Sequence, residues 1–248
     1  MSHQNHLESK PKRGIYLLPN LFTISALFAG FYAVVAALKG HFDNAAIAIF
    51  IAMVMDSLDG RVARLTNTQT GFGAQLDSLS DMVSFGLAPA LVVYSWSLSL
   101  LGKSGWLAAF IYAVAVALRL ARFNTQLHRS DKRYFRGFPC PAAAAIIAST
   151  VWIGHFYPKP SFTMSFIIGI FVVMIGLLMV SNIRYRSFKD LDLKNRVSFK
   201  AIISVVMILV FIAINPPQVL FIIFLLYGLS GPVFAVWRWF KHRHHHAR

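Results

Sequence analysis

The sequence predicts an all-α integral membrane protein with about eight transmembrane helices, and three observations lead to this fold class. Hydrophobic residues make up 57% of the 248 residues and charged residues only 13%, about half the charged fraction of a soluble domain. The apolar residues are gathered in runs of about 20, the length at which a helix crosses a bilayer. Lys and Arg number 24, against 9 Asp and Glu. These features exclude a soluble globular enzyme and a disordered chain.

Eight apolar runs are long enough to form the spans. They lie near residues 17–38, 45–64, 73–98, 105–124, 140–157, 161–181, 199–214 and 218–237. Because backbone groups in lipid must bond within their own segment, runs of this length predict helices rather than barrel strands. The third run is long, and Ala88-Pro89 predicts a kink or break within it, since proline disrupts a helix. The seventh run is short and stops at Asn215-Pro216-Pro217.

The distribution of Lys and Arg predicts the orientation of the spans. An even number of spans puts both termini on one side, and only Lys39, Lys103 and Lys159 of the 24 basic residues then fall on the other side. Basic residues concentrate on the cytoplasmic side of membrane proteins, so we expect cytoplasmic termini and loops in the inner, cytoplasmic membrane. This basic rim explains the net charge of +15, and no nucleic-acid partner is expected.

Four of the nine acidic residues are crowded between positions 56 and 81, beside or inside apolar runs. An aspartate near the middle of a transmembrane helix costs about 2.5–3.5 kcal/mol. Asp56 and Asp59 are three residues apart on one predicted helix. Asp77 and Asp81 are four apart on the next, so each pair shares one helix face. The polar, threonine-rich residues 65–72 predict a turn, and antiparallel folding about it brings all four carboxylates to one depth.

Carboxylates at this density predict a metal site. Like charges so close together cannot all stay ionised unaided, and all-oxygen ligation favours one or two Mg²⁺ or Mn²⁺ ions, with Ca²⁺ able to substitute. Asp56, Gly60 and Arg64 form a stripe on one helix face, where Gly60 leaves room for a ligand and Arg64 offers a forked donor to phosphate. This combination suits phosphoryl transfer, in which metals neutralise a diphosphate and an aspartate accepts a hydroxyl proton.

The residues alone leave two other interpretations open. The aspartates could pair with arginines, either in a structural network or along the ion or proton path of a cation-coupled transporter. The candidate partners are Arg61, Arg64, Arg119 and Arg122. A non-catalytic membrane scaffold is the other interpretation, but it gives no reason for four costly aspartates at one depth.

Between Asp56 and Asp81 the chain fits the pattern D-x2-D-G-x2-A-R-x8-G-x3-D-x3-D at every fixed position. This segment resembles the signature of the CDP-alcohol phosphatidyltransferases, integral membrane enzymes that move a phosphatidyl group from a CDP-linked lipid to an alcohol and release CMP. The resemblance implies two divalent cations bound by the four aspartates, and it implies that Asp81 is the general base. It also implies a homodimer.

The same resemblance implies contacts with the CDP-linked lipid. Gly60, Arg64 and Thr70 match positions that contact the cytidine diphosphate moiety. The start of the first span resembles the family's N-terminal motif, which places Asn20 and Thr23 near the diphosphate. The phenylalanine-rich spans, with 22 Phe in the chain, could line a groove for the lipid chains.

Further stretches are similar to family members whose acceptor alcohol is serine. They are residues 80–90, 119–124, 135–144 and 179–190. This similarity implies transfer from CDP-diacylglycerol to L-serine. The serine carboxylate requires a cationic partner, and Arg119 and Arg122 share one face at the cytoplasmic end of the fourth span, although anchoring at the membrane surface is their alternative role. Glycerol 3-phosphate, inositol phosphate and choline remain alternative acceptors.

The resemblance also suggests how the chain is organised. The expected parts are a polar cytoplasmic N-terminus (1–14), a six-span catalytic core (15–190), two further spans (191–237) and a basic cytoplasmic tail (238–248). Two sets of residues are predicted to have packing roles only. Ser78, Ser80 and Ser84 would join helices through their hydroxyls, and the single cysteine, Cys140, would be a small buried residue.

Overall fold

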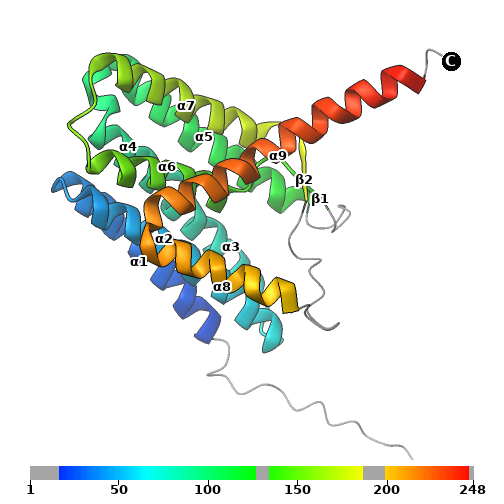
Figure 1. Ribbon diagram of the computed structural model, residues 1–248. Coiled ribbons are helices and arrows are strands. Elements are labelled where there is room, and N and C mark those ends of the chain that lie inside the picture. Colours follow the sequence, from blue (N-terminus) through cyan, green and yellow to red (C-terminus); the bar gives the residue numbers. More distant parts are fainter. Residues whose placement is uncertain (1–16, 127–133, 187–198, 246–248) are drawn as a thin grey trace, which may run out of the picture.

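The computed structural model describes residues 17–126, 134–186 and 199–245, and this part of the chain is almost entirely helical (Figure 1). The helices are α1 (Leu17–Leu38), α2 (Phe42–Leu65), α3 (Gly71–Asp81), the π-helical η2 (Met82–Leu87), α4 (Ala88–Trp96), the 3₁₀-helical η3 (Leu98–Leu101), α5 (Lys103–Gln126), α6 (Cys140–His155), α7 (Phe162–Val180), α8 (Phe199–Ile214) and α9 (Pro216–His245). Two short strands, β1 (Tyr134–Arg136) and β2 (Arg184–Arg186), form an antiparallel ribbon. The predicted all-α membrane fold is confirmed, and the ribbon is an addition that the sequence did not predict.

The eight predicted runs coincide with eight helical segments, the third of which is α3, η2 and α4 in succession. Five segments are long and apolar enough to cross a membrane: Leu17–Leu38, Gly71–Trp96, Lys103–Thr125, Phe162–Val180 and Pro216–Ala235. Of the others, α6 is a shorter apolar helix and α8 has 16 residues. The helix α2 carries charged residues near its end: Asp56, Asp59, Arg61 and Arg64. The last helix continues to His245, so that its end extends beyond the bundle (Figure 1). The predicted polar N-terminus lies outside the described residues.

The predicted interruption near Ala88-Pro89 is present as a widened turn rather than an end. The chain passes from α3 through the π-helical η2 into α4, which has Pro89 in its first turn. Proline has no N–H to donate to the carbonyl four residues earlier, which is that of Phe85. The hydroxyl of Tyr112 on α5 donates a 2.9 Å hydrogen bond to this carbonyl instead. The helix therefore continues across the proline, with its freed backbone group satisfied by a neighbouring helix.

Small residues allow α1 to lie against both α2 and η2. The buried alanines of α1 and α2 are Ala26, Ala29, Ala33, Ala36, Ala37, Ala45, Ala46, Ala48 and Ala52. Such residues let helix backbones come close in a membrane. The closest approach is at Gly30, where an added Cβ would lie 2.7 Å from the Cα of Ser84.

Serine hydroxyls hold the third segment in place, as predicted. The hydroxyl of Ser84 donates to the carbonyl of Ala26 at 3.0 Å, and that of Ser80 donates to the carbonyl of Thr23 at 3.0 Å. These bonds fix α3 and η2 on α1. They therefore fix the height of the aspartates that α3 carries.

Candidate active site

The turn between α2 and α3 is built by threonines, as the sequence predicts. The hydroxyls of Thr66 and Thr68 are 2.7 Å apart and bonded to each other. Asn67 between them has a φ of 53°, a left-handed conformation that asparagine tolerates. The hydroxyl of Thr70 accepts a 3.0 Å hydrogen bond from the N–H of Gly73 and so caps the start of α3. The tight turn directs α3 back toward the bundle, where it packs mainly on α1.

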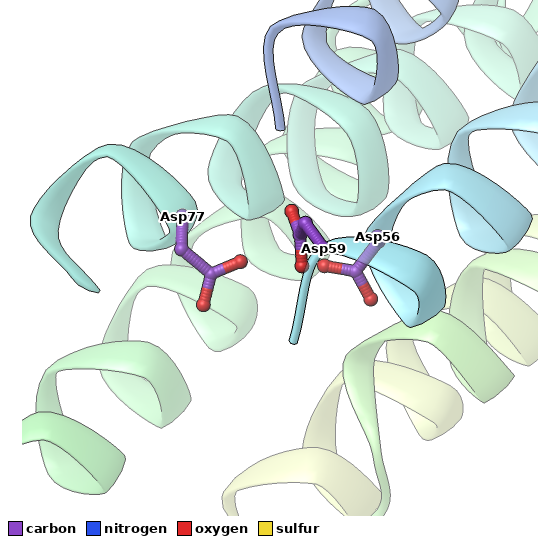
Figure 2. Close-up of side chains that lie close together, drawn as sticks. All are labelled: Asp56, Asp59 and Asp77. Atoms are coloured by element: carbon purple, nitrogen blue, oxygen red, sulfur yellow. The ribbon is translucent and has the colours of Figure 1, made fainter. Parts of the chain in front are cut away.

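This hairpin brings three of the four aspartates together (Figure 2). Asp56, Asp59 and Asp77 each offer one carboxylate oxygen, and these oxygens all lie within 4.8 Å of one another. The carboxyl of Asp81 lies within hydrogen-bonding reach of the carboxyl of Asp56. The antiparallel arrangement inferred from the spacing of the aspartates is thus the arrangement that the structure has.

The cluster fits a divalent cation. Oδ1 of Asp81 is buried and has no hydrogen-bond partner among the described residues, and leaving a buried acceptor unsatisfied costs about 1–3 kcal/mol. Oδ2 of Asp59 accepts a 2.7 Å hydrogen bond from the hydroxyl of Thr23, which orients this carboxylate. Three convergent carboxylate oxygens, together with a fourth carboxylate that has a buried oxygen without a donor among the described residues, form the kind of ligand set that hard cations prefer. The cluster can therefore bind a metal ion.

The residues expected to contact the CDP-linked lipid lie on α1, α2 and the turn. Asn20 lies beside the start of α3, since a Cβ added at Gly73 would be 3.3 Å from its Oδ1 and 3.1 Å from Oγ1 of Thr70. Gly60 faces open space, because a Cβ added there would meet nothing within 4 Å. Arg64, one turn further along α2, is exposed. The structure thus leaves the Gly60 face of α2 free for a ligand.

The two arginines near the end of α5 contact different elements. Arg119 Nη1 donates a 3.2 Å hydrogen bond to the sulfur of Cys140, while its Nε is buried without a partner among the described residues. Arg122 donates to the carbonyl of Val180 at 3.4 Å and to Oδ1 of Asn182 at 2.5 Å, at the end of α7. Arg119 and Arg122 were predicted to share one helix face, but in the structure their guanidinium groups bond to different partners.

The alternative in which arginines neutralise the aspartates finds no support in this geometry. Within residues 17–126, 134–186 and 199–245, no ion pair joins the aspartate cluster to an arginine, and both Arg61 and Arg64 are exposed. Among the described residues, the carboxylates of the cluster therefore have no cation paired with them.

Two residues near the cluster were not singled out as functional by the sequence. Asn124 of α5 donates a 3.0 Å hydrogen bond to the hydroxyl of Ser78, next to Asp77. Cys140 is fully buried, as predicted for a packing residue, but it lies within electrostatic range of both Arg119 and Asp81. The only signal in the sequence was that both residues fall in stretches similar to serine-using family members.

Comparison with known proteins identifies the family. The profile described as CDP-alcohol phosphatidyltransferase matches residues 16–237. The chain therefore belongs to the CDP-alcohol phosphatidyltransferase family, as the aspartate motif predicts.

Curated relatives extend the similarity along most of the chain. A protein of Helicobacter pylori (strain J99) named CDP-diacylglycerol–serine O-phosphatidyltransferase is 37% identical over 230 residues, which are 91% of this chain and 95% of the relative. A protein of the same name from Mycobacterium tuberculosis (strain H37Rv) is 32% identical over 235 residues, 91% of this chain and 80% of the relative. An archaetidylserine synthase of Methanothermobacter thermautotrophicus is 34% identical over 170 residues, 68% of this chain and 69% of the relative.

Proposed function

We propose that this chain transfers the phosphatidyl group of CDP-diacylglycerol to the hydroxyl of L-serine, with release of CMP and formation of phosphatidylserine. The observation that carries the proposal is the convergence of Asp56, Asp59 and Asp77 in a chain of this family. Relatives that cover 91% of the chain are named for transfer to serine. The archaeal relative is named for a different lipid, yet serine is again part of the product's name.

The proposed metal ligands are the four aspartates, Asp56, Asp59, Asp77 and Asp81, around two Mg²⁺ or Mn²⁺ ions, with Ca²⁺ able to substitute. When bound, such ions supply positive charge that neutralises a diphosphate. Thr23 holds Asp59 in a fixed orientation through its hydrogen bond. The unpartnered Oδ1 of Asp81 supports its inclusion in this set.

The CDP moiety is proposed to lie along the start of α1, the Gly60 face of α2 and the turn. The proposed contacts are Asn20, Thr23, Gly60, Arg64 and Thr70. The open space at Gly60 supports this location, because a ligand can lie against the helix backbone there. Arg64, which is exposed, provides a forked donor to phosphate oxygens.

Asp81 is proposed as the general base. Its carboxylate accepts the proton of the serine hydroxyl while the serine oxygen forms a bond to the lipid-side phosphorus of the diphosphate. The bond between that phosphorus and the oxygen bridging to CMP breaks, and CMP leaves with the bridging oxygen and its electron pair. Oδ1 of Asp81, which is buried and has no hydrogen-bond partner among the described residues, can take this proton.

Arg119 and Arg122 are proposed to hold the serine carboxylate. Nε of Arg119 is a buried donor that lacks a partner among the described residues. Within the described part of the chain, its Nη1 bonds to a sulfur alone, which is a weak acceptor. A carboxylate at this position would satisfy a guanidinium that the protein leaves poorly paired.

The site is proposed to face the cytoplasm, with both termini on that side of the inner membrane. In the predicted topology, most Lys and Arg residues fall on the side of the termini, and this distribution supports the orientation. The catalytic core is assigned to residues 15–190, followed by two further spans over residues 191–237, and the chain is proposed to act as a homodimer.

The deciding experiment gives the purified protein CDP-diacylglycerol, Mn²⁺ or Mg²⁺, and one acceptor at a time, and measures CMP. Release with serine supports the proposal. Release only with glycerol 3-phosphate, inositol phosphate or choline would replace serine as the acceptor. No CMP with any acceptor, together with cation flux across vesicles, would favour a transporter.

A further inference from the structure

The last helix is joined to the ribbon at a proline. Pro232 lies inside α9 and has no N–H, so the carbonyl of Gly228, four residues earlier, lacks its helical partner. The hydroxyl of Tyr185 in β2 donates a 3.0 Å hydrogen bond to this carbonyl. Because Tyr185 is only 1% exposed, the bond is made inside the protein, where the carbonyl has no access to water.

A glycine next to this proline lets the ribbon and the helix come into direct contact. A Cβ added at Gly231 would lie 2.3 Å from Cζ of Tyr185, a distance that no side chain tolerates without displacing the ring. The phenol of Tyr185 therefore packs on the backbone of α9. The hydrogen bond and the close contact together fix both the rotation and the height of α9 on the ribbon.

This fixed position brings Tyr227 of α9 into an aromatic cluster with Phe138 and Tyr185. The ring centroid of Tyr227 is 5.8 Å from that of Phe138 and 5.8 Å from that of Tyr185. The Phe138 and Tyr185 centroids are 5.4 Å apart. Phe138 precedes α6 by two residues, so the cluster lies next to Cys140 at the start of that helix.

The aromatic cluster adjoins the poorly paired guanidinium of Arg119. This group donates to Cys140 at 3.2 Å, and its charge also acts on the phenol of Tyr227. Cys140 is in turn within electrostatic range of Asp81. Arg119, bonded to Cys140, and Tyr227, packed on Phe138 two residues before Cys140, therefore lie at the same end of α6.

We propose that α9 closes the acceptor end of the site, and that Tyr227 is a specificity-determining residue for the acceptor. This inference rests on the proposed function, since it places the serine carboxylate at Arg119. Tyr227 bounds the space beside the guanidinium, so that only a small acceptor reaches both Arg119 and Asp81. Tyr185 acts as a positioning residue, because its bond to Gly228 holds Tyr227 at that place.

The test replaces Tyr227 with Leu and measures KM for serine and for CDP-diacylglycerol by CMP release. We expect KM for serine to rise about tenfold and KM for the lipid to stay within about twofold, because only the acceptor end is opened. The rate with homoserine relative to serine should rise, which a purely structural role would not produce. Gly231→Ala, which pushes on Tyr185, should raise KM for serine about threefold.

Two variants are matched controls. Phe224→Leu changes an aromatic residue of the same helix that packs on Phe50, with centroids 6.4 Å apart, and it should leave both KM values unchanged. Gly169→Ala adds a methyl group to α7 in ordinary contact, 3.5 Å from Leu101, and should do the same.

The outcomes separate this inference from the proposed function. A wild-type protein that releases no CMP with serine overturns the proposed function. A wild-type protein that is active, with a Tyr227→Leu variant whose serine KM and homoserine ratio are unchanged, overturns only the role of α9. If the Leu variant does not fold, Tyr185→Phe decides, because it removes the bond to Gly228 that holds Tyr227 in place: a rise in KM for serine alone supports the inference, and KM values that are unchanged or rise together contradict it.

Discussion

The hydroxyl of Thr23 donates a 2.7 Å hydrogen bond to Oδ2 of Asp59 and thereby ties α1 to the aspartate cluster. The carbonyl of the same residue accepts a 3.0 Å hydrogen bond from Ser80, which precedes Asp81. One residue of α1 is therefore bonded to both helices that carry the aspartates. The first helix has no acidic residue of its own, yet it sets the relative position of the proposed metal ligands.

Thr23→Val should weaken activation by Mn²⁺. The variant removes the hydroxyl that orients Asp59, and loss of such an outer partner typically lowers metal affinity about 10- to 100-fold. The measurement is the initial rate of CMP release as a function of Mn²⁺ concentration. Thr23→Ser keeps the hydroxyl and should behave like the wild type, as should Ser25→Ala, whose hydroxyl bonds only to the carbonyl of Leu21. An unchanged Mn²⁺ dependence in Thr23→Val would contradict this role.

Asp81→Asn should lose turnover without losing stability. An amide cannot accept the serine proton, so we expect CMP release at saturating metal to fall about 10²- to 10⁴-fold. Thermal unfolding in the presence of a chelator should occur at the same temperature or higher, because one of several neighbouring like charges is gone. Asp43→Asn, at the first turn of α2, is the matched control and should remain active. Turnover near the wild-type level in Asp81→Asn would remove Asp81 as the base.

Gly30→Ala should destabilise the fold. The added methyl group would lie 2.6 Å from Oγ and 2.7 Å from Cα of Ser84, so α1 and η2 must separate. Overpacking of this kind costs about 1–3 kcal/mol. The free energy of unfolding can be measured with denaturant in detergent, with Gly169→Ala as the control at a site of ordinary contact. Equal stability of the two variants would show that the close approach is not needed.

Thr70→Gly separates two roles of one hydroxyl. Glycine is tolerated as an N-cap at a cost of a few tenths of a kcal/mol, so the stability of the protein should change little. If the hydroxyl also contacts the CDP moiety, KM for CDP-diacylglycerol should rise about tenfold, since a hydrogen bond to a charged group is lost. Thr70→Ser should restore the wild-type KM. A KM that does not respond to Thr70→Gly would limit Thr70 to capping α3.

The sequence predicts the helices and the aspartate hairpin well because both depend on local spacing. In lipid, the length of an apolar run determines the length of the helix, so the predicted runs end within a few residues of the helices in most cases. The spacing of Asp56 and Asp59, with the threonine-rich turn, is enough to predict which side chains face α3. The interruption at Pro89 is predicted for the same reason, since proline acts on its own helix.

The acceptor end of the site could not be predicted because it is assembled from distant segments. The pairing of β1 with β2 joins residues about 50 positions apart, and nothing local in either strand specifies its partner. The contact of Arg119 with Cys140 and the approach of Tyr227 likewise depend on how α5, α6 and α9 pack. The last helix carries no recognisable motif, so its packing on α6 and β2 appears only in the assembled bundle.

Two carbonyl groups, each four residues before a proline, influence which elements pack together in the bundle. The carbonyls of Phe85 and Gly228 each lie four residues before a proline, which has no N–H to offer them, and lipid offers no donor in its place. A tyrosine hydroxyl from another element donates to each carbonyl, Tyr112 of α5 to Phe85 and Tyr185 of β2 to Gly228. Apolar faces in a membrane discriminate poorly between neighbours, because lipid chains are as apolar as leucine. Two tyrosine hydroxyls, one on α5 and one in β2, therefore favour one neighbour and one register for each of the two proline-containing helices.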